Sequence, residues 1–355
     1  MEVSRIVTGV EAPQGYPVPG SENRTDRAGI QAGSPMDAAA LSSAFEAAVA
    51  NVCRVLFGRQ DVVRLALCCL IADGHLLVED LPGVGKTTLA KALARSVGIG
   101  FRRVQFTADM LPADVTGAVV YDRESSELTF RPGPIFTNVL LADELNRASP
   151  KAQSALLEAM EEHQVSADGI TRPLPLPFMV IATQNPFDAA GTYPLPHSQR
   201  DRFLIRVALG YPPREAEDHL LANAPTRPAV DSLEAVWGTE MLAAMNQAVS
   251  RVHVEPAIRS YVLDIVTATR AHPDISVGAS PRAALALLRA GSAVAVAKGR
   301  TFLTPDDIKV VATYVLAHRL LASPAAERAG VGADDVVRDL LGRVGVPVAR
   351  RNPAG

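Results

Sequence analysis

The stretch DLPGVGKTT, residues 80–88, decides the fold of this chain. It follows the apolar residues 76–78 and precedes a helical pattern over residues 89–96. Glycines in such a loop let backbone N–H groups converge on phosphate oxygens, and the start of the next helix adds partial positive charge. The loop therefore predicts a phosphate site, with a plain glycine-rich turn as the alternative. Asp80 stands where the usual eight-residue pattern has its first glycine.

In this loop, Lys86 is predicted to reach the β- and γ-phosphates, and the Thr87 hydroxyl is predicted to bind magnesium. The predicted nucleotide-binding residues are Pro82, Gly83, Val84, Gly85, Lys86, Thr87 and Thr88.

A second apolar run, residues 138–142, ends in Asp143 and Glu144. Beside a phosphate loop, Asp143 would position the magnesium ion, and Glu144 would activate the attacking water as a general base. Two acids after a strand also suit a solvated turn, and only the preceding phosphate loop favours the catalytic interpretation.

Three polar residues further along the chain have candidate roles. Asn185, after the apolar run 178–182, is placed to contact the γ-phosphate or the water, although Asn before Pro is also common in turns. Arg202 is a candidate arginine finger for the nucleotide of a neighbouring subunit, with Arg200 as the competing residue. Arg282, in the first turn of a predicted helix, could reach the γ-phosphate from a second domain; a solvated arginine is the alternative.

Outward from the loop, short apolar runs alternate with helical segments as far as residue 207. This alternation predicts a mostly parallel sheet flanked by helices, an α/β fold. From about 214 to 346 only helices are expected, two of them starting at Ser280-Pro281 and Thr304-Pro305. The predicted strands are 75–79, 103–106, 139–142, 178–182 and 203–207, and the predicted domains are a disordered tail (1–35), a nucleotide-binding core (36–210) and a helical lid (211–355).

Two segments of the core read as β-hairpins. Residues 119–121 and 128–130 flank a polar turn, and residues 164–166 and 170–172 flank Asp168-Gly169, a pair that suits a tight turn.

Composition narrows the function classes. The net charge of -3 among 355 residues gives no reason to expect nucleic acid or a membrane surface as the main partner. No apolar run is long enough to span a bilayer, and the N-terminus has no apolar signal segment, so a cytoplasmic location is expected. Cys53, Cys68 and Cys69 lie in helical stretches and are interpreted as core residues rather than a redox or metal site.

Together these motifs resemble the AAA+ superfamily and, within it, the MoxR family. The resemblance covers roughly residues 55–320 and is carried by residues 106–117, 133–148, 151–162 and 182–186, with 191–203 as a further match. It implies a P-loop AAA+ core with β-hairpin insertions and a C-terminal all-helical lid. His197-Ser198 departs from the acidic-and-small pair more usual before the finger.

The resemblance also implies function. It implies ATP and Mg²⁺ as cofactors, a homo-oligomeric, hexameric ring, and composite sites in which Asn185 is the first sensor, Arg202 the finger and Arg282 the second sensor. Family members are associated with chaperone-like maturation of protein complexes, including metal-cofactor insertion, and with adaptors that carry von Willebrand factor A-type domains. A protein client is therefore expected, and neither nucleic acid nor membrane insertion is.

Three other functions stay open at this point. A nucleic-acid-dependent AAA+ motor would favour a basic, aromatic-lined loop, whereas the hairpin at Asp168 offers Arg172 and no aromatic residue. A small-molecule kinase needs no helical sensor domain. A scaffold that binds nucleotide without hydrolysing it would not need Glu144.

Overall fold

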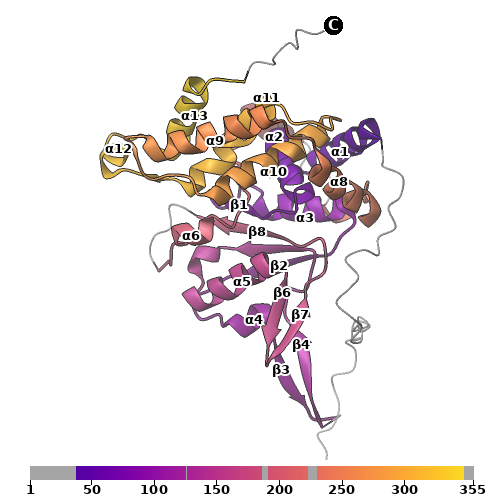
Figure 1. Ribbon diagram of the computed structural model, residues 1–355. Coiled ribbons are helices and arrows are strands. Elements are labelled where there is room, and N and C mark those ends of the chain that lie inside the picture. The colour runs from indigo at the N-terminus through magenta and orange to yellow at the C-terminus, as the bar shows by residue number, and fades with distance from the viewer. Residues whose placement is uncertain (1–36, 125, 186–190, 223–229, 348–355) are drawn as a thin grey trace, which may run out of the picture. The chain divides into compact units, whose positions relative to one another are not determined.

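The computed structural model describes residues 37–124, 126–185, 191–222 and 230–347. The predicted tail, 1–35, and Pro186 of the sensor motif lie outside the described residues. A five-stranded parallel sheet has the order β2-β5-β8-β1-β9 (Figure 1). Its strands are β1 (Leu76–Glu79), β2 (Phe101–Gln105), β5 (Val139–Asp143), β8 (Met179–Gln184) and β9 (Ile205–Val207). The predicted α/β fold is confirmed.

Strand order brings the sequence motifs to one edge of this sheet. β8 lies between β1 and β5, with Val78 opposite Thr183 and Ala142 opposite Ala182. Because the strands are parallel, the loop after β1 and the residues that follow β5 and β8 all meet at the carboxyl edge.

Both faces of the sheet are buried at its three central strands, β5, β8 and β1. Val78 and Leu141 pack into one hydrophobic cluster, and Leu77 and Leu140 pack into the other. Burial on two faces explains why these strands read as continuous apolar runs instead of alternating patterns. The first cluster continues into helices beyond residue 230, so the lid shares a core with that face of the sheet. The boundary at 210/211 stays a prediction.

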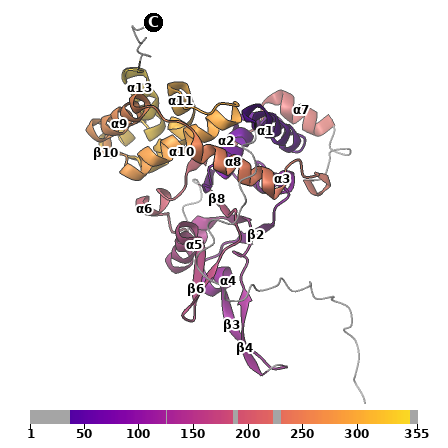
Figure 2. The same cartoon turned by 45° about the vertical axis from the view of Figure 1, so that its right-hand side comes forward.

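Outside this sheet, helices account for most of the residues that the structure describes (Figures 1 and 2). They are α1 (Ala38–Cys53), α2 (Gln60–Ile71), α3 (Lys86–Val97), α4 (Pro112–Thr116), α5 (Pro150–Glu162), α6 (His197–Arg200), α7 (Arg214–Ala222), α8 (Thr239–Arg251), α9 (Pro256–Ala271), α10 (Pro281–Ala297), α11 (Pro305–Leu316), α12 (Pro324–Arg328) and α13 (Ala333–Arg343), with 3₁₀ turns at η1 (Leu145–Arg147), η2 (Val230–Ser232) and η3 (Ala317–Arg319).

Both predicted helix starts in the lid are confirmed. The Ser280 side chain accepts a hydrogen bond from the backbone N–H of Ala283 and caps α10, which begins at Pro281. Thr304 precedes α11, and the backbone N–H of Thr304 donates a hydrogen bond to the Asp307 carboxylate. Such caps satisfy N–H groups that have no partner within the helix.

The expectation of helices alone beyond residue 213 is wrong at one place. β10 (Ile275–Val277) and β11 (Leu321–Ala322) form a small antiparallel pair, to which the Ser276 hydroxyl adds a hydrogen bond with the Ala322 carbonyl. These strands are too short to display a period of two, and they pair across more than 40 residues of sequence. Only the packing of the lid brings them together.

Both predicted hairpins are confirmed. They are β3 (Gly117–Asp122) with β4 (Glu127–Pro132), and β6 (Gln164–Ala167) with β7 (Ile170–Pro173). Asp168 and Gly169 both have positive φ, of 51° and 75°, as a tight hairpin turn requires. The two hairpins lie side by side (Figures 1 and 2), and the Arg172 guanidinium carbon lies 3.8 Å from the centre of the Phe130 ring.

Two of the three cysteines belong to the core, and Cys53 is partly buried against it. Cys68 and Cys69 in α2 are buried, and burial raises the pKa of the Cys68 thiol to about 12. Among the described residues, no three His, Cys, Asp or Glu side chains gather as a metal site. In the same part of the chain, no helix is long and apolar enough to cross a membrane.

Candidate nucleotide site

The phosphate loop is the whole connection between β1, which ends at Glu79, and α3, which begins at Lys86. Gly83 and Gly85 have φ of +81° and +102°, a region of backbone conformation that residues other than glycine rarely adopt. A Cβ on Gly85 would also lie 3.1 Å from the Leu56 side chain. The loop geometry thus depends on both glycines, and it leaves the first N–H groups of α3 without partners in their own helix, as anion binding requires.

Asp80 has a structural reason for replacing the first glycine. Its carboxylate is buried, and it accepts hydrogen bonds from the Leu81 N–H at 2.8 Å and the Gly210 N–H at 2.6 Å. These bonds tie the start of the loop to the segment after β9. The Asp80 carbonyl accepts a hydrogen bond from Lys86 Nζ at 2.8 Å, so the departure is compatible with a loop that presents Lys86.

The acidic pair lies at the same edge, after β5. Thr183, fully buried at the end of β8, donates a hydrogen bond to Asp143 Oδ1 at 2.6 Å and accepts one from the Glu144 N–H at 2.9 Å. Arg103, from β2, pairs with Asp143 Oδ2 at 2.7 Å. Glu144 is in the left-handed region with φ 56°, and its carboxylate lies 3.0 Å from Arg147. Its side chain is 36% exposed, so water has access to it.

Lys86 lies within the electrostatic influence of Asp143 and Glu144. Burial lowers the pKa of Lys86, and the negative charges of Asp143, Asp80 and Glu144 act in the opposite direction. The half-buried Asn185 follows β8, the strand between the other two motifs. The carboxyl edge therefore gathers the predicted phosphate, metal and water-activating residues in one place.

The residues predicted to hold magnesium offer suitable chemistry. Thr87 supplies a hydroxyl in the first turn of α3, and Asp143 supplies a carboxylate at the end of β5. Oxygen donors of this kind suit Mg²⁺, which also takes phosphate oxygens and water. The Arg103 side chain that pairs with Asp143 is 49% exposed.

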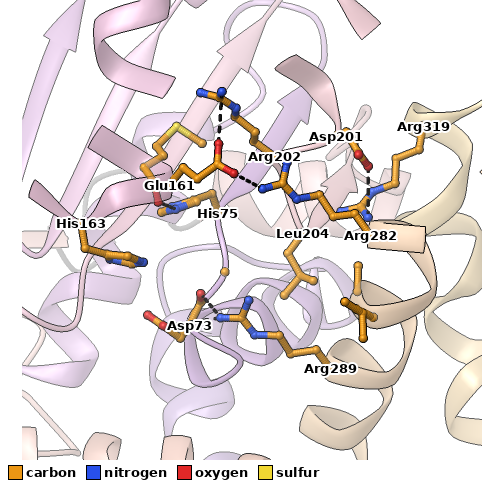
Figure 3. Close-up of a pocket in the computed structure, with 14 residues that line it drawn as sticks. Asp73, His75, Glu161, His163, Asp201, Arg202, Leu204, Arg282, Arg289 and Arg319 are labelled. Atoms are coloured by element: carbon orange, nitrogen blue, oxygen red, sulfur yellow. Dashed lines mark hydrogen bonds and ion pairs between the residues drawn. The ribbon is translucent and has the colours of Figure 1, made fainter. Parts of the chain in front are cut away.

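Arg202 and Arg282 lie elsewhere, at the amino edge of the sheet. Arg202 precedes β9, and its Nη2 lies 3.1 Å from Glu161 Oε2 at the end of α5. Arg282, in the first turn of α10, donates a hydrogen bond to the other oxygen of Glu161 (Figure 3). They line a cavity of about 270 Å³ with Asp73 and His75, which come before β1.

The phosphate loop follows the other end of β1. Four residues of strand, about 13 Å, separate that loop from the cavity with Arg202 and Arg282. The sequence expectation placed Arg282 on the γ-phosphate from the lid, but the structure has it beside Arg202, away from its own subunit's loop. Its role as a nucleotide-binding residue stays a prediction.

Similar proteins identify the family of this chain. Residues 75–205 match the ATPase family associated with various cellular activities (AAA), and residues 267–340 match the AAA lid domain. The uncharacterised protein YeaC of Bacillus subtilis strain 168 is 45% identical over 85% of this chain and 95% of its own length. The chaperone MoxR1 of Mycobacterium tuberculosis H37Rv is 36% identical over 96% of this chain and 92% of its own.

The chain belongs to the MoxR family of AAA+ ATPases.

A solved structure supports the same assignment. The crystal structure of a presumed ATPase from Cytophaga hutchinsonii ATCC 33406 superposes with a TM-score of 0.82 at 32% identity, covering 88% of this chain and 97% of the other. As a MoxR-family AAA+ protein, the chain binds nucleotide and hydrolyses ATP. This excludes a small-molecule kinase and a scaffold that does not hydrolyse ATP.

Sequence reasoning missed three contributors to the two edges. Thr183 lies within the family motif 182–186 and has no role predicted from the sequence, although it holds both acids. Arg103 pairs with Asp143 from a neighbouring strand, and Glu161 pairs with two arginines from distant segments. The position of Thr183 at the end of an apolar strand was a usable signal. Glu161 lies in the family motif 151–162, but nothing in the sequence indicated the pairing of Glu161 or of Arg103, because charged residues on edge strands and helix ends are usually solvated.

Proposed function

We propose that this MoxR-family ATPase works as a homo-oligomeric ring, a hexamer, whose ATP sites are shared between neighbouring subunits. One observation carries the proposal: Lys86, Asp143 and Glu144 lie at the carboxyl edge of the sheet, whereas Arg202 and Arg282 lie at the amino edge. One subunit therefore does not bring all these groups to one nucleotide. Two copies, arranged so that the amino edge of one faces the carboxyl edge of the next, would do so. Such a head-to-tail contact closes into a ring if its rotation allows.

Each residue has a defined role in this shared site. Lys86 and the backbone N–H groups of residues 83–88 hold the phosphates, and Glu144 accepts the proton of the attacking water. Thr87 and Asp143 hold Mg²⁺, which neutralises phosphate charge when bound. Asn185 orients the water or the γ-phosphate. Arg202, with Arg200 as the alternative, and Arg282 come from the neighbour and stabilise charge on the transferred phosphoryl group.

The hairpins are the proposed contact with a protein client. Tyr121 and Leu128 on β3 and β4 are 60% and 73% exposed, and Ile170 on β7 is 56% exposed. Side chains of this kind bind apolar segments of other proteins. The stacking of Arg172 on Phe130 would make the hairpins move together.

We assign the protein to chaperone-like remodelling or maturation of partner complexes, including metal-cofactor insertion, with a von Willebrand factor A-type domain protein as adaptor. The naming of MoxR1 as a chaperone supports the chaperone role, and the family resemblance supports the adaptor. γ-Phosphate contacts would favour one arrangement of the ring and phosphate release another, so that hydrolysis moves the hairpins against the client.

The shared site is tested by mixing two variants. Glu144→Gln and Arg202→Ala are each expected to be nearly inactive alone. In a mixture, a site with the Glu144 of one variant and the Arg202 of the other is complete, so ATP hydrolysis should return. If each variant exchanges subunits with labelled wild type and the mixture still stays inactive, the shared site is ruled out.

The client surface is tested with an unfolded protein such as casein. Casein is expected to stimulate ATP hydrolysis by the wild type and not by a Tyr121→Ser, Leu128→Ser double variant. The matched control is Leu263→Ser, a leucine on α9 that is 57% exposed. Stimulation by single-stranded DNA that falls with added salt would instead favour the nucleic-acid motor.

A further inference from the structure

Glu161 joins three elements of the chain through one carboxylate. It lies near the end of α5 in the core; its Oε2 pairs with Arg202 from the segment after α6, and its Oε1 accepts a hydrogen bond from Arg282 of the lid helix α10 (Figure 3). Core and lid therefore meet at the two arginines proposed to reach the neighbour's nucleotide.

The other arginines lining this cavity have different carboxylate partners. Arg289 lies 3.4 Å from Asp73, and Arg319 lies 3.4 Å from Asp201 (Figure 3). Within the cavity, Glu161 is thus the carboxylate shared by two guanidinium groups. Because two like charges repel at close range, a shared carboxylate stabilises their approach.

The shared carboxylate is charged and accessible. The hydrogen bond from Arg282 lowers the pKa of Glu161, and the charges of Arg282 and Arg202 act in the same direction. The side chains of Arg202, Arg282 and Glu161 are 29%, 46% and 36% exposed. A guanidinium group has five N–H donors, so each arginine keeps donors for a phosphate after it has paired with Glu161.

We infer that Glu161 is a positioning residue for the shared ATP site: it holds Arg202 and Arg282 as one unit, so that both reach the neighbour's γ-phosphate together. The inference rests on the shared site proposed above. It also gives the lid a route to the finger, because a movement of α10 displaces Arg282 and, through Glu161, Arg202. Without the carboxylate, the two arginines would separate and reach the phosphate independently.

The first measurement is steady-state ATP hydrolysis by Glu161→Gln, which keeps the size of the side chain and removes its charge. A displacement of about 1 Å in a catalytic group can cost about 10²-fold in rate, so kcat should fall by about that factor. KM for ATP should change little, since the residues of the phosphate loop are intact. Glu161→Asp, which keeps the charge on a shorter arm, should recover part of kcat. Glu162→Gln, at an exposed neighbouring position on α5, is the matched control and should behave as wild type.

The second measurement separates positioning from a general structural role. Glu161→Gln mixed with Glu144→Gln should regain ATP hydrolysis, because the Glu144→Gln subunit supplies an intact pair of arginines. Glu161→Gln mixed with Arg202→Ala should regain none, because both variants are defective on the same face. A merely destabilised subunit would not produce this pattern.

The reference mixture of Glu144→Gln and Arg202→Ala distinguishes two failures. If the reference recovers and the mixture of Glu161→Gln with Glu144→Gln does not, the role of Glu161 is wrong and the shared site stands. If the reference variants exchange subunits with labelled wild type and their mixture still does not recover, the shared site and the inference that rests on it both fall. A rise of kcat in Glu161→Gln would also overturn the inference, since it would make Glu161 an inhibitory latch.

Discussion

The two edges of the sheet are built in different ways. At the carboxyl edge, the functional groups follow strands and are held by backbone geometry, by Thr183 and by the glycines of the phosphate loop. At the amino edge, Arg202 and Arg282 come from segments about 80 residues apart and are held by the side chain of Glu161. A backbone-defined site can be read from a short motif, whereas a side-chain-defined site depends on which segments meet.

The sharpest test of this contrast is the loss of the finger. Arg202→Ala is expected to lower ATP hydrolysis by about 10³–10⁵, or about 4–7 kcal/mol, while the subunit still binds ATP. The measurement is kcat together with equilibrium binding of a fluorescent ATP analogue. Arg338→Ala, an arginine 63% exposed on α13, should leave both unchanged. If Arg202→Ala hydrolysed ATP at the wild-type rate, the role of arginine finger would pass to Arg200.

Acid should destabilise the amino edge. His75 accepts a hydrogen bond from the Val180 N–H, and its burial lowers its pKa from 6.5 to about 4. The unfolded chain binds this proton more readily than the folded chain does. The contribution of neutral His75 to the free energy of unfolding is therefore fully present above pH 6.5 and is lost as the pH drops to about 4. The loss amounts to about 3 kcal/mol. His318, which hydrogen-bonds the Phe203 carbonyl, has a pKa lowered by the same cause and adds to the loss.

Urea unfolding at several pH values measures this loss. His75→Gln should flatten the profile between pH 6.5 and about 4, whereas His253→Gln, at a position 66% exposed, should follow the wild type. An unchanged profile in His75→Gln would assign the acid sensitivity to other groups.

Thr183→Val tests the carboxyl edge. It removes the hydrogen bonds to Asp143 and Glu144 while keeping the shape of the side chain. Loss of groups that orient catalytic and metal-binding side chains typically costs about 10–100-fold, and ATP hydrolysis should fall by that factor. Thr269→Val is a close control, since Thr269 is also fully buried and also makes two hydrogen bonds, with Val266 and Ala279. Equal effects on hydrolysis would mean that only stability had changed.

The smallest expected effect concerns the start of α10. Ser280→Ala removes the cap of this helix and the hydrogen bond to Asp201, the residue before Arg202. Loss of a cap costs about 1 kcal/mol. The control is Ser323→Ala, which removes the cap of α12. It should lower the free energy of unfolding by about the same amount, as measured by thermal unfolding. Only Ser280→Ala should also lower kcat, because only this cap adjoins the two arginines; equal kcat values would contradict that link.

The sequence predicted local features well. Residues 80–88 required a strand before and a helix after, and both predicted hairpins and both proline-marked helix starts formed as expected. The small pair β10 and β11 escaped prediction because its strands have two or three residues and pair only through the packing of the lid.

The sequence by itself determined the fold class, the phosphate loop and the acidic pair after β5, because glycine geometry, apolar runs and helix starts are local properties of the chain. Only the tertiary structure decided that Asp80 ties the phosphate loop to the segment after β9, that Thr183 holds both acids and that Glu161 binds Arg202 and Arg282. These contacts join residues between 39 and 130 positions apart. Their partners are fixed by the strand order β2-β5-β8-β1-β9 and by the lid packed beside the sheet, not by spacing along the chain.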